Sequence, residues 1–271
     1  MKPLISYYGG KQRLAGKILD LIPPHSIYCE PFCGGAAVFY KLVDSQKATA
    51  HSYVLNDIND HLINMYRVAK SEPDKFFKMI DGTLNSFSDF KRAGRILKDP
   101  ESFDAVTRAW AFYVGTMQSF SNVGPNSGWK RAKVHGRTHQ GIISAMDRVP
   151  QQIQQLKKAT IEKCDAIDCI RNWDTDSTFF LIDPPYTGAK HKYCAGYTIE
   201  EYQKLIQRLT TIKGQFILTN YPQDVQLPDT WNVIKNQVAC TAAAIKRGGE
   251  RHPRTELFIT NLPDVSNRWR I

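Results

Sequence analysis

The sharpest chemical signal in the sequence is the tetrapeptide Asp183-Pro184-Pro185-Tyr186, which directly follows an apolar run at 179–182. Such a run is typical of a buried strand, so the tetrapeptide is expected at a strand's carboxyl end. Its two prolines remove two backbone donors and stiffen the turn. The remaining carboxylate, carbonyls and aromatic ring suit an exocyclic amino group on a flat ring. The alternative is a rigid turn without a chemical role.

A second candidate is the glycine turn at 30–35, Glu-Pro-Phe-Cys-Gly-Gly, where a short strand should end and a helix begin. Glycines allow the backbone to approach a ligand closely in the crevice beyond a strand's carboxyl end. The turn does not match the G-x-G-x-x-G pattern of dinucleotide-binding enzymes, which argues against hydride transfer. The segment Gly9-Gly10-Lys11 likewise does not match a phosphate-binding P-loop. A Gly-Gly turn can also be purely structural.

Two aspartates follow expected strands in the same way. Asp57 comes roughly twenty residues after the glycine turn, where a carboxylate can accept hydrogen bonds from the ribose hydroxyls of an adenosyl ligand. Asp165 follows a third expected strand and could accept an adenine amino group. Each can instead be a helix N-cap, and Asn59 is the other candidate cap for the helix after Asp57.

Composition and charge narrow the class of partner. The 271 residues are 42% hydrophobic and 23% charged, which is typical of a globular protein and excludes a disordered or fibrous one. With 36 Lys and Arg against 26 Asp and Glu, the net charge is +10 and the pI is near 9.3. Such a surplus favours a polyanionic partner, and nucleic acid is the first candidate. The alternative is a basic protein without a nucleic-acid partner.

Other features concern metals and compartment. The six cysteines contain no C-x-x-C pair, so we do not expect a zinc site: positions 29, 33, 164, 169, 194 and 240. No apolar run approaches the ~20 residues of a membrane span, and the first residues do not resemble a secretory signal. We therefore expect a cytoplasmic protein with reduced thiols, no bound metal, no membrane association and no obligate protein partner.

The elements that must position these residues alternate along the chain. Strands are predicted at 26–29, 52–55, 160–163, 178–182, 215–219, 232–238 and 256–260. Helices are predicted at 14–22, 36–43, 106–117, 166–172 and 198–209, with a further helix carrying the apolar residues of 62–66. This alternation favours an α/β fold, a mostly parallel sheet covered on both faces. The last two strands could form a terminal hairpin.

The alternation of strands and helices is interrupted between residues 71 and 158. In this region helical segments surround a loop rich in Ser, Asn and Gly at 119–128. We interpret 71–158 as a module inserted into one catalytic domain, which is formed by 1–70 and 159–271.

Four motifs occur in a fixed order: YYGGK at 7–11, EPFCGG at 30–35, NDIN at 56–59 and DPPY at 183–186. In this combination the chain resembles the Dam-like adenine-specific DNA methyltransferases of the alpha order, from residue 7 to about residue 262. The resemblance implies a Rossmann-like methyltransferase sheet with an inserted, mainly helical target-recognition module. It also implies S-adenosyl-L-methionine as the methyl donor and double-stranded DNA as the substrate.

The resemblance also assigns roles by position. Tyr7, Phe32 and Gly34 match the cofactor pocket, and Lys11 matches a lysine that contacts both cofactor and catalytic Asp. The other implied cofactor contacts are the ribose acceptor Asp57, Asp165 near the adenine, and Asp183 near the sulfonium. One departure stands out, because the family's F-x-G-x-G turn ends here in alanine at position 36. The middle block, around 118–129, also departs from the pattern of the GATC-reading members, which leaves the recognition sequence open.

A mechanism follows from these parts. Asp183 and the Pro184 carbonyl can each accept one N–H of the target amine, which favours a charge-bearing transition state. Pro185 completes the rigid turn, and Tyr186 would stack on the target base. A base inside a duplex is unreachable, so it must be flipped out.

Two basic clusters could hold the DNA backbone while the base is flipped. They comprise Lys130, Arg131, Lys133 and Arg137, and Lys246, Arg247, Arg251 and Arg254. Either cluster could instead be a solvated face. In the 119–128 loop, Asn122 and Asn126 are candidates for reading base edges, because their side chains offer short donors and acceptors.

The rival hypotheses are an N4-cytosine DNA or N6-adenine RNA methyltransferase, which would use similar chemistry, and a DNA-binding module without catalysis. The motif order and the long insertion favour DNA adenine. A silent module would be expected to lose Asp183 or Lys11, and both are present.

Overall fold

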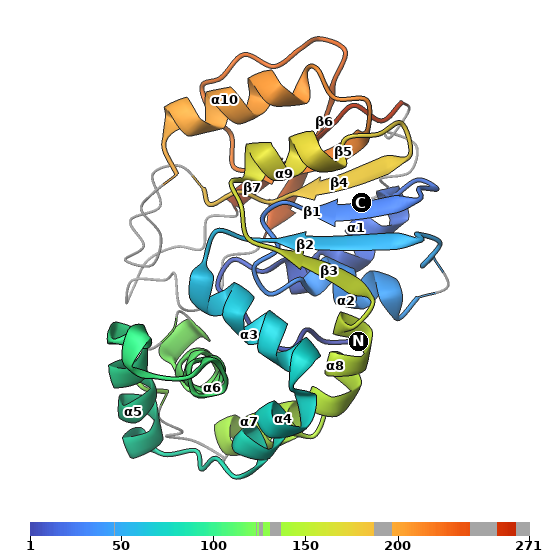
Figure 1. Cartoon of the computed structure of the whole chain (residues 1–271). Helices are drawn as coiled ribbons and strands as arrows, with labels where there is room; N and C mark the ends of the chain where they lie inside the picture. Colours follow the sequence, from blue (N-terminus) through green and yellow to red (C-terminus); the bar gives the residue numbers. More distant parts are fainter. Residues whose placement is uncertain are drawn as a thin grey trace.

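A twisted seven-stranded sheet forms the centre of the computed structural model (Figure 1). The structure describes residues 1–45, 47–122, 124, 127–130, 137–186, 197–238 and 254–263. The strands lie in the order β3-β2-β1-β4-β5-β7-β6. Their bounds are β1 Ile27–Glu30, β2 Ser52–Asn56, β3 Ala159–Glu162, β4 Thr178–Ile182, β5 Gln215–Asn220, β6 Asn232–Val238 and β7 Arg254–Thr260.

Strand directions explain why the sequence motifs meet. The five strands from β3 to β5 are parallel, whereas β7 pairs antiparallel with both β5 and β6. The predicted parallel sheet and terminal hairpin are therefore confirmed. The order of strands reverses between β1 and β4, and ligand crevices of open α/β sheets lie at such a switch point. The 30–35 turn follows β1 and the 183–186 turn follows β4, so both lie at the same edge of the sheet, beside the switch point.

Alternate residues of the apolar strands supply two hydrophobic clusters, one on each face of the sheet. Tyr28 and Phe179 belong to the cluster covered by α1 (Ala15–Leu21) and α2 (Ala37–Val43). Their neighbours Cys29 and Phe180 belong to the cluster covered by α9 (Ala166–Trp173) and α10 (Ile199–Leu209) (Figure 1). Burial on both faces is the reason these strands read as continuous apolar runs.

The middle of the chain is helical, as predicted. It contains α4 (Pro73–Asp81), α5 (Phe87–Lys98), α6 (Ala105–Met117), α7 (Arg137–Met146) and α8 (Val149–Leu156), and it follows α3 (Asp60–Ser71). Among the described residues, no helix is long and apolar enough to cross a membrane.

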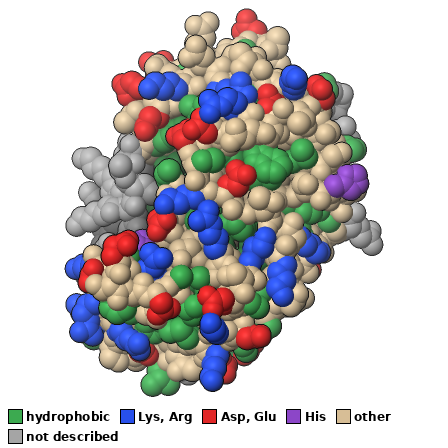
Figure 2. Space-filling model, viewed as in Figure 1, with side chains coloured by type: hydrophobic (Ala, Val, Ile, Leu, Met, Phe, Trp, Pro, Cys, Tyr) green, Lys and Arg blue, Asp and Glu red, His purple; other side chains and the backbone are tan. Residues whose placement is uncertain are grey.

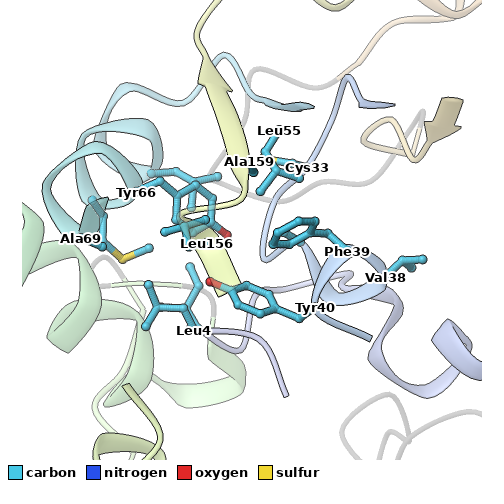
Figure 3. Packing of buried hydrophobic residues seen from close by; sticks show 14 of the residues in the cluster. Leu4, Cys33, Val38, Phe39, Tyr40, Leu55, Tyr66, Ala69, Leu156 and Ala159 are labelled. Atoms are coloured by element: carbon cyan, nitrogen blue, oxygen red, sulfur yellow. The ribbon is translucent and has the colours of Figure 1, made fainter. Parts of the chain in front are cut away.

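These middle helices share a core with the sheet domain. Figure 3 shows Leu156 of α8 beside Leu4, Tyr40 and Tyr66, and all four belong to one cluster. The buried Gln152 side chain of α8 also donates to the carbonyls of Lys2 and Pro3, at 3.0 and 2.8 Å. Residues 71–158 are therefore continuous in packing with the rest, and their role in target recognition stays a prediction.

The alanine that departs from the family's glycine turn adopts a glycine-like conformation. Ala36 caps α2 with φ 52° and ψ 38°, in the left-handed region. An L-residue there costs ~1–2 kcal/mol because its Cβ crowds the backbone. The turn therefore keeps the backbone shape of a glycine although it carries a methyl group.

We expect Ala36→Gly to raise the free energy of unfolding by about 1 kcal/mol, because relief of this crowding exceeds the lost methyl burial. Ala37→Gly is the matched control. It makes the same chemical change inside a regular helix and should lower stability by about 1 kcal/mol. Urea unfolding of both variants decides the matter, and equal destabilisation by the two would contradict the strain at position 36.

Candidate active site

A buried ion pair joins the first motif to the last. Lys11, which begins the 3-10 helix η1 (Lys11–Arg13), is 7% exposed. Its Nζ donates to Asp183 Oδ1 at 2.5 Å and to the Tyr186 hydroxyl oxygen at 2.8 Å. The structure thus brings Lys11, Asp183 and Tyr186 together, although their roles in catalysis stay predictions.

A second carboxylate reaches the same ammonium. Glu256 of β7 lies with its Oε1 3.3 Å from Lys11 Nζ, and it accepts a hydrogen bond from the Tyr186 hydroxyl. Thr219 of β5 donates to Asp183 Oδ1 at 2.6 Å. Four segments of the chain therefore converge on one polar network at the edge of the sheet where β4 and β5 end.

The electrostatics of this network fix its protonation. Burial alone would lower the pKa of Lys11, but Asp183 and Glu256 attract the ammonium, and the pKa lies above its usual value. Burial, followed by the charges of Asp183 and Glu256, raises the pKa of Tyr186 far above its usual value. Lys11 is therefore a cation and Tyr186 a neutral phenol across the physiological range, so neither is a general base here.

The remaining residues of the 183–186 turn differ in exposure. Pro184 is buried, Pro185 is exposed, and the ring of Tyr186 lies 4.3 Å from that of Tyr221 at an angle of 51°. Tyr186 thus has its hydroxyl held on one side and its ring supported by a second aromatic residue.

The glycine turn after β1 is built around Tyr7. Gly34 has φ +45°, and a Cβ at this position would lie 3.1 Å from the Tyr7 ring. The Gly34 carbonyl accepts from the Tyr66 hydroxyl at 2.7 Å, and its N–H donates to Asp57 Oδ2 at 3.0 Å. Tyr7 itself accepts a hydrogen bond from the Asn59 amide at its hydroxyl. Glycine is needed here for both conformation and space.

Asp57 is not the cap of the following helix. Asn59 caps α3 by accepting from His61 N and Leu62 N, whereas Asp57 Oδ1 accepts from Asn59 N at 2.9 Å. Burial raises the pKa of Asp57, and backbone hydrogen bonds from Asn59 and Gly34 oppose that shift. The helix-cap hypothesis for Asp57 is therefore wrong, while its role as a ribose acceptor stays a prediction.

Asp165 is the N-cap of α9, where its exposed side chain accepts from Ile167 N at 2.8 Å. This confirms the structural alternative and leaves its second carboxylate oxygen for a ligand. Phe32 packs edge-on against Tyr197, with ring centroids 5.8 Å apart. Contacts of Phe32 and Asp165 with a cofactor stay predictions.

Asn56 connects the loops that follow β1 and β3. It is the first residue of the NDIN motif, but no role was assigned to it from the sequence. Its amide donates to the carbonyls of Pro31 and Cys164 at 2.9 and 3.0 Å, and its Oδ1 accepts from Cys164 N. The loops after β1 and β3 are thereby tied to the end of β2. Thr219, Tyr221 and Glu256 were missed as well. For Asn56 the available signal was a polar residue at the end of an otherwise apolar strand.

Only part of the predicted DNA-contacting set falls within the described residues. Asn122 adopts φ 53° and Lys130 is half-buried, which lowers the pKa of its ammonium. The ends of the 119–128 loop are joined, because Phe120 N donates to Gly128 O and Lys130 N to Gln118 O. Arg137 begins α7 and Arg254 begins β7, but their side chains lie outside the description, as do the residues Asn126, Arg131, Lys133, Lys246, Arg247 and Arg251.

Figure 2 shows Lys and Arg side chains interspersed with Asp and Glu over the face in view. The surplus of positive charge is therefore not gathered into one uninterrupted patch on this face. The two basic clusters stay predictions from the sequence.

One group of side chains has metal-binding potential. Ligand atoms of Glu162, Cys164 and Cys169 lie within 4.8 Å of one another. Burial raises the pKa of the Cys164 thiol to about 11, and its Sγ donates to Asn56 Oδ1 at 3.3 Å. This contact ties the thiol to the loop that Asn56 holds. The described cysteines Cys29, Cys33, Cys164 and Cys169 are free thiols, as expected.

The strand order, and the turns after β1 and β4 at its switch point, define a Rossmann-like α/β fold. A family model described as D12 class N6 adenine-specific DNA methyltransferase matches residues 7–227. The chain belongs to this family and is an adenine-specific DNA methyltransferase.

Relatives that carry methyltransferase names are similar to this chain over most of its length. The type II methyltransferase M1.LlaDCHI of Lactococcus lactis subsp. cremoris is 26% identical, over 96% of this chain and 95% of the relative. M.CviBI of Paramecium bursaria Chlorella virus NC1A is 25% identical, over 80% of this chain and 82% of its own length. M.MjaIII of Methanocaldococcus jannaschii is 29% identical over 69% of each chain. The family assignment removes the cytosine, RNA and non-catalytic alternatives.

Glu30, at the start of the glycine turn, is a buried carboxyl group that has no hydrogen bond to Lys11, Asp183 or Tyr186 among the described contacts. It is 3% exposed and accepts from the Tyr28 hydroxyl and from Phe39 N, both at Oε1. Burial raises its pKa from 4.5 to about 8, and the two hydrogen bonds only partly oppose the shift. Glu30 is therefore protonated in the native state at neutral pH.

This shift gives a prediction about stability and pH. Between the unfolded pKa of 4.5 and the native value of about 8, the native state binds one more proton, so stability falls as pH rises through that window. Glu30→Gln keeps an oxygen for both donors and removes the titration. Urea unfolding at pH 5 to 8 should show the wild type losing about 1 kcal/mol per pH unit relative to the variant. Parallel stability curves would show that Glu30 does not titrate there.

Proposed function

We propose that the crevice beyond β1 and β4 binds S-adenosyl-L-methionine and a flipped adenine of double-stranded DNA, and that Asp183 is the catalytic acceptor. The carrying observation is the pairing of Lys11 with Asp183 at the switch point of the sheet. When bound, S-adenosyl-L-methionine supplies a methyl group on a sulfonium. The residues proposed to hold it are Tyr7, Lys11, Phe32, Gly34, Asp57, Asp165 and Asp183.

The side chains present fit such a ligand. Gly34 lets the Tyr7 ring pack directly against the turn, because a Cβ at this position would lie 3.1 Å from that ring. Asp57 is half-buried and accepts backbone hydrogen bonds from Gly34, Asn59 and Ile58, fewer than the about four lone-pair sites of a carboxylate, which leaves an acceptor site for a ribose hydroxyl. Asp165 likewise uses Oδ1 for its cap.

Asp183 is oriented for the target amine. Among the described residues, Lys11 and Thr219 both donate to its Oδ1, which leaves Oδ2 to accept an N–H from the adenine amino group. The Pro184 carbonyl is proposed as the second acceptor, and Pro185 keeps the turn rigid. Acceptors placed in this way stabilise the positive charge that develops on the nitrogen during transfer.

Tyr186 is proposed to stack on the flipped adenine. Its hydroxyl is held by Lys11 and Glu256 and its ring packs against Tyr221, so the ring is positioned before the base arrives. Flipping costs a few kcal/mol, and contacts from the two basic clusters to phosphates would offset that cost. We place the enzyme in the cytoplasm with its DNA, and the type II names of its relatives suggest a restriction-modification role.

Asp183→Ala should abolish methyl transfer while the fold survives, because the change removes the acceptor for the amine without removing core packing. Turnover would be measured with duplex DNA and labelled cofactor, and folding by thermal melting. Modified-base sequencing of DNA from a methylation-deficient host should show N6-methyladenine in one short motif with the wild type and none with the variant. Turnover within tenfold of the wild type would sink the catalytic assignment.

In the inserted block we expect positioning and base reading to separate. Lys133→Ala should weaken binding to all sequences and lower the salt slope of log K by about 0.9, the effect of one lost phosphate contact. Asn122→Ala or Asn126→Ala should instead relax one position of the motif by ~1–3 kcal/mol. Binding isotherms at several salt concentrations test the prediction for Lys133→Ala, and modified-base sequencing tests the predictions for the two Asn variants. A wild-type salt slope for Lys133→Ala, or full specificity for the Asn variants, would contradict this division.

A further inference from the structure

Glu256 is a buried acid that the motifs of the sequence do not include. It lies on β7 and is 5% exposed. The neighbouring residue Leu257 pairs with Asn220, the last residue of β5. Because β7 runs antiparallel to β5, its first residues lie at the edge where β4 and β5 end. Glu256 is thereby placed beside the 183–186 turn, although its strand is separated from β4 by β5.

Among the residues that the structure describes, the charges in contact with Glu256 do not balance. Within the part of the chain that the structure describes, Lys11 is the only cation within 4 Å of the Asp183 or Glu256 carboxylates. Two carboxylates thus share one ammonium. A buried carboxylate is costly unless it is paired and hydrogen-bonded, and Glu256 compensates with the Tyr186 hydroxyl and the longer contact to Lys11.

This sharing has a consequence for Asp183. If Lys11 had Asp183 as its sole partner, the pair would be close to neutral. With Glu256 beside it, the ammonium is divided between two acids, and these three groups, the charged ones that the described residues place in contact here, carry a net negative charge. Such a pocket favours a cationic ligand over a neutral one of the same shape.

We propose that Glu256 is a positioning residue that holds Lys11 and Tyr186 against the Asp183 turn and keeps the pocket negative. The pocket would thereby prefer the sulfonium form of the cofactor over its neutral thioether product. This proposal rests on the proposed cofactor. It adds a means by which the enzyme binds S-adenosyl-L-methionine in the presence of S-adenosyl-L-homocysteine.

Glu256→Gln is the test, because glutamine keeps the size and an oxygen that can accept from Tyr186 while it removes the charge. Calorimetry on the full chain would measure dissociation constants for both ligands. We expect the constant for S-adenosyl-L-methionine to rise about tenfold and that for S-adenosyl-L-homocysteine to change by less than about twofold, since only the former carries the sulfonium charge.

Two further variants separate charge from hydrogen bonding. Thr219→Val is nearly isosteric and removes one hydrogen bond to Asp183 without changing charge, so turnover should fall while the ratio of the two dissociation constants stays at the wild-type value. Glu256→Asp keeps the charge and should keep the ratio. Glu256→Asp also serves as the test if Glu256→Gln fails to fold. In that case the ratio of its two dissociation constants is compared with the wild-type ratio. A shift of preference towards S-adenosyl-L-homocysteine would overturn the proposal, because the charge is kept.

The outcomes are distinct from those that test the function. An equal ratio in the wild type and Glu256→Gln overturns the role of Glu256, whatever the activity. Wild-type protein that binds both ligands but leaves duplex adenine unmethylated would instead overturn the proposed function, while the ratio would still decide the role of Glu256.

Discussion

The Lys11 ammonium is buried between two carboxylates, and the geometry of the crevice depends on this contact. Lys11 and Asp183 are 172 positions apart in the chain, and Glu256 comes from a third segment. Loss of Lys11 would leave both carboxylates without a cation, and removal of one partner from a buried ion pair typically costs about 3–5 kcal/mol. The contact therefore fixes the loop before η1, the turn after β4 and the start of β7 relative to one another. It also fixes the oxygen of Asp183 that is left for a ligand.

The sheet makes this contact possible through strand direction. Parallel strands deliver their carboxyl ends to one edge, so the turns after β1 and β4 meet there. A sixth parallel strand beside β5 would bring its own carboxyl end to that edge and its first residues to the opposite one. The antiparallel β7 does the reverse, and its first residues, including Glu256, reach the site. The terminal hairpin is thus part of the candidate site as well as the end of the sheet.

Much of the fold was predictable because its strands are buried on both faces and bounded by turn residues. The β4 and β6 limits agree with the prediction, and other strand limits differ by a few residues at most. The turns after β1 and β4 were predictable for the same reason. Glu256 and Thr219 were not, because their contacts depend on which strands become neighbours, and a single sequence does not specify that order. Local patterns also could not decide between Asp57 and Asn59 as the cap of α3, since both are favoured cap residues.

Helix α3 links the crevice to the middle of the chain. It begins directly after Asp57 and Asn59, the residues that order the glycine turn. Farther along, Asn64 donates to the Ala105 carbonyl at the start of α6, and His61 stacks near Phe112. Because these contacts lie in the same core that holds Leu4 and Tyr40, a shift of α6 would be transmitted to α3 by close packing. If 71–158 recognises the target, its helices are thus already in mechanical contact with the residues proposed to hold the methyl donor.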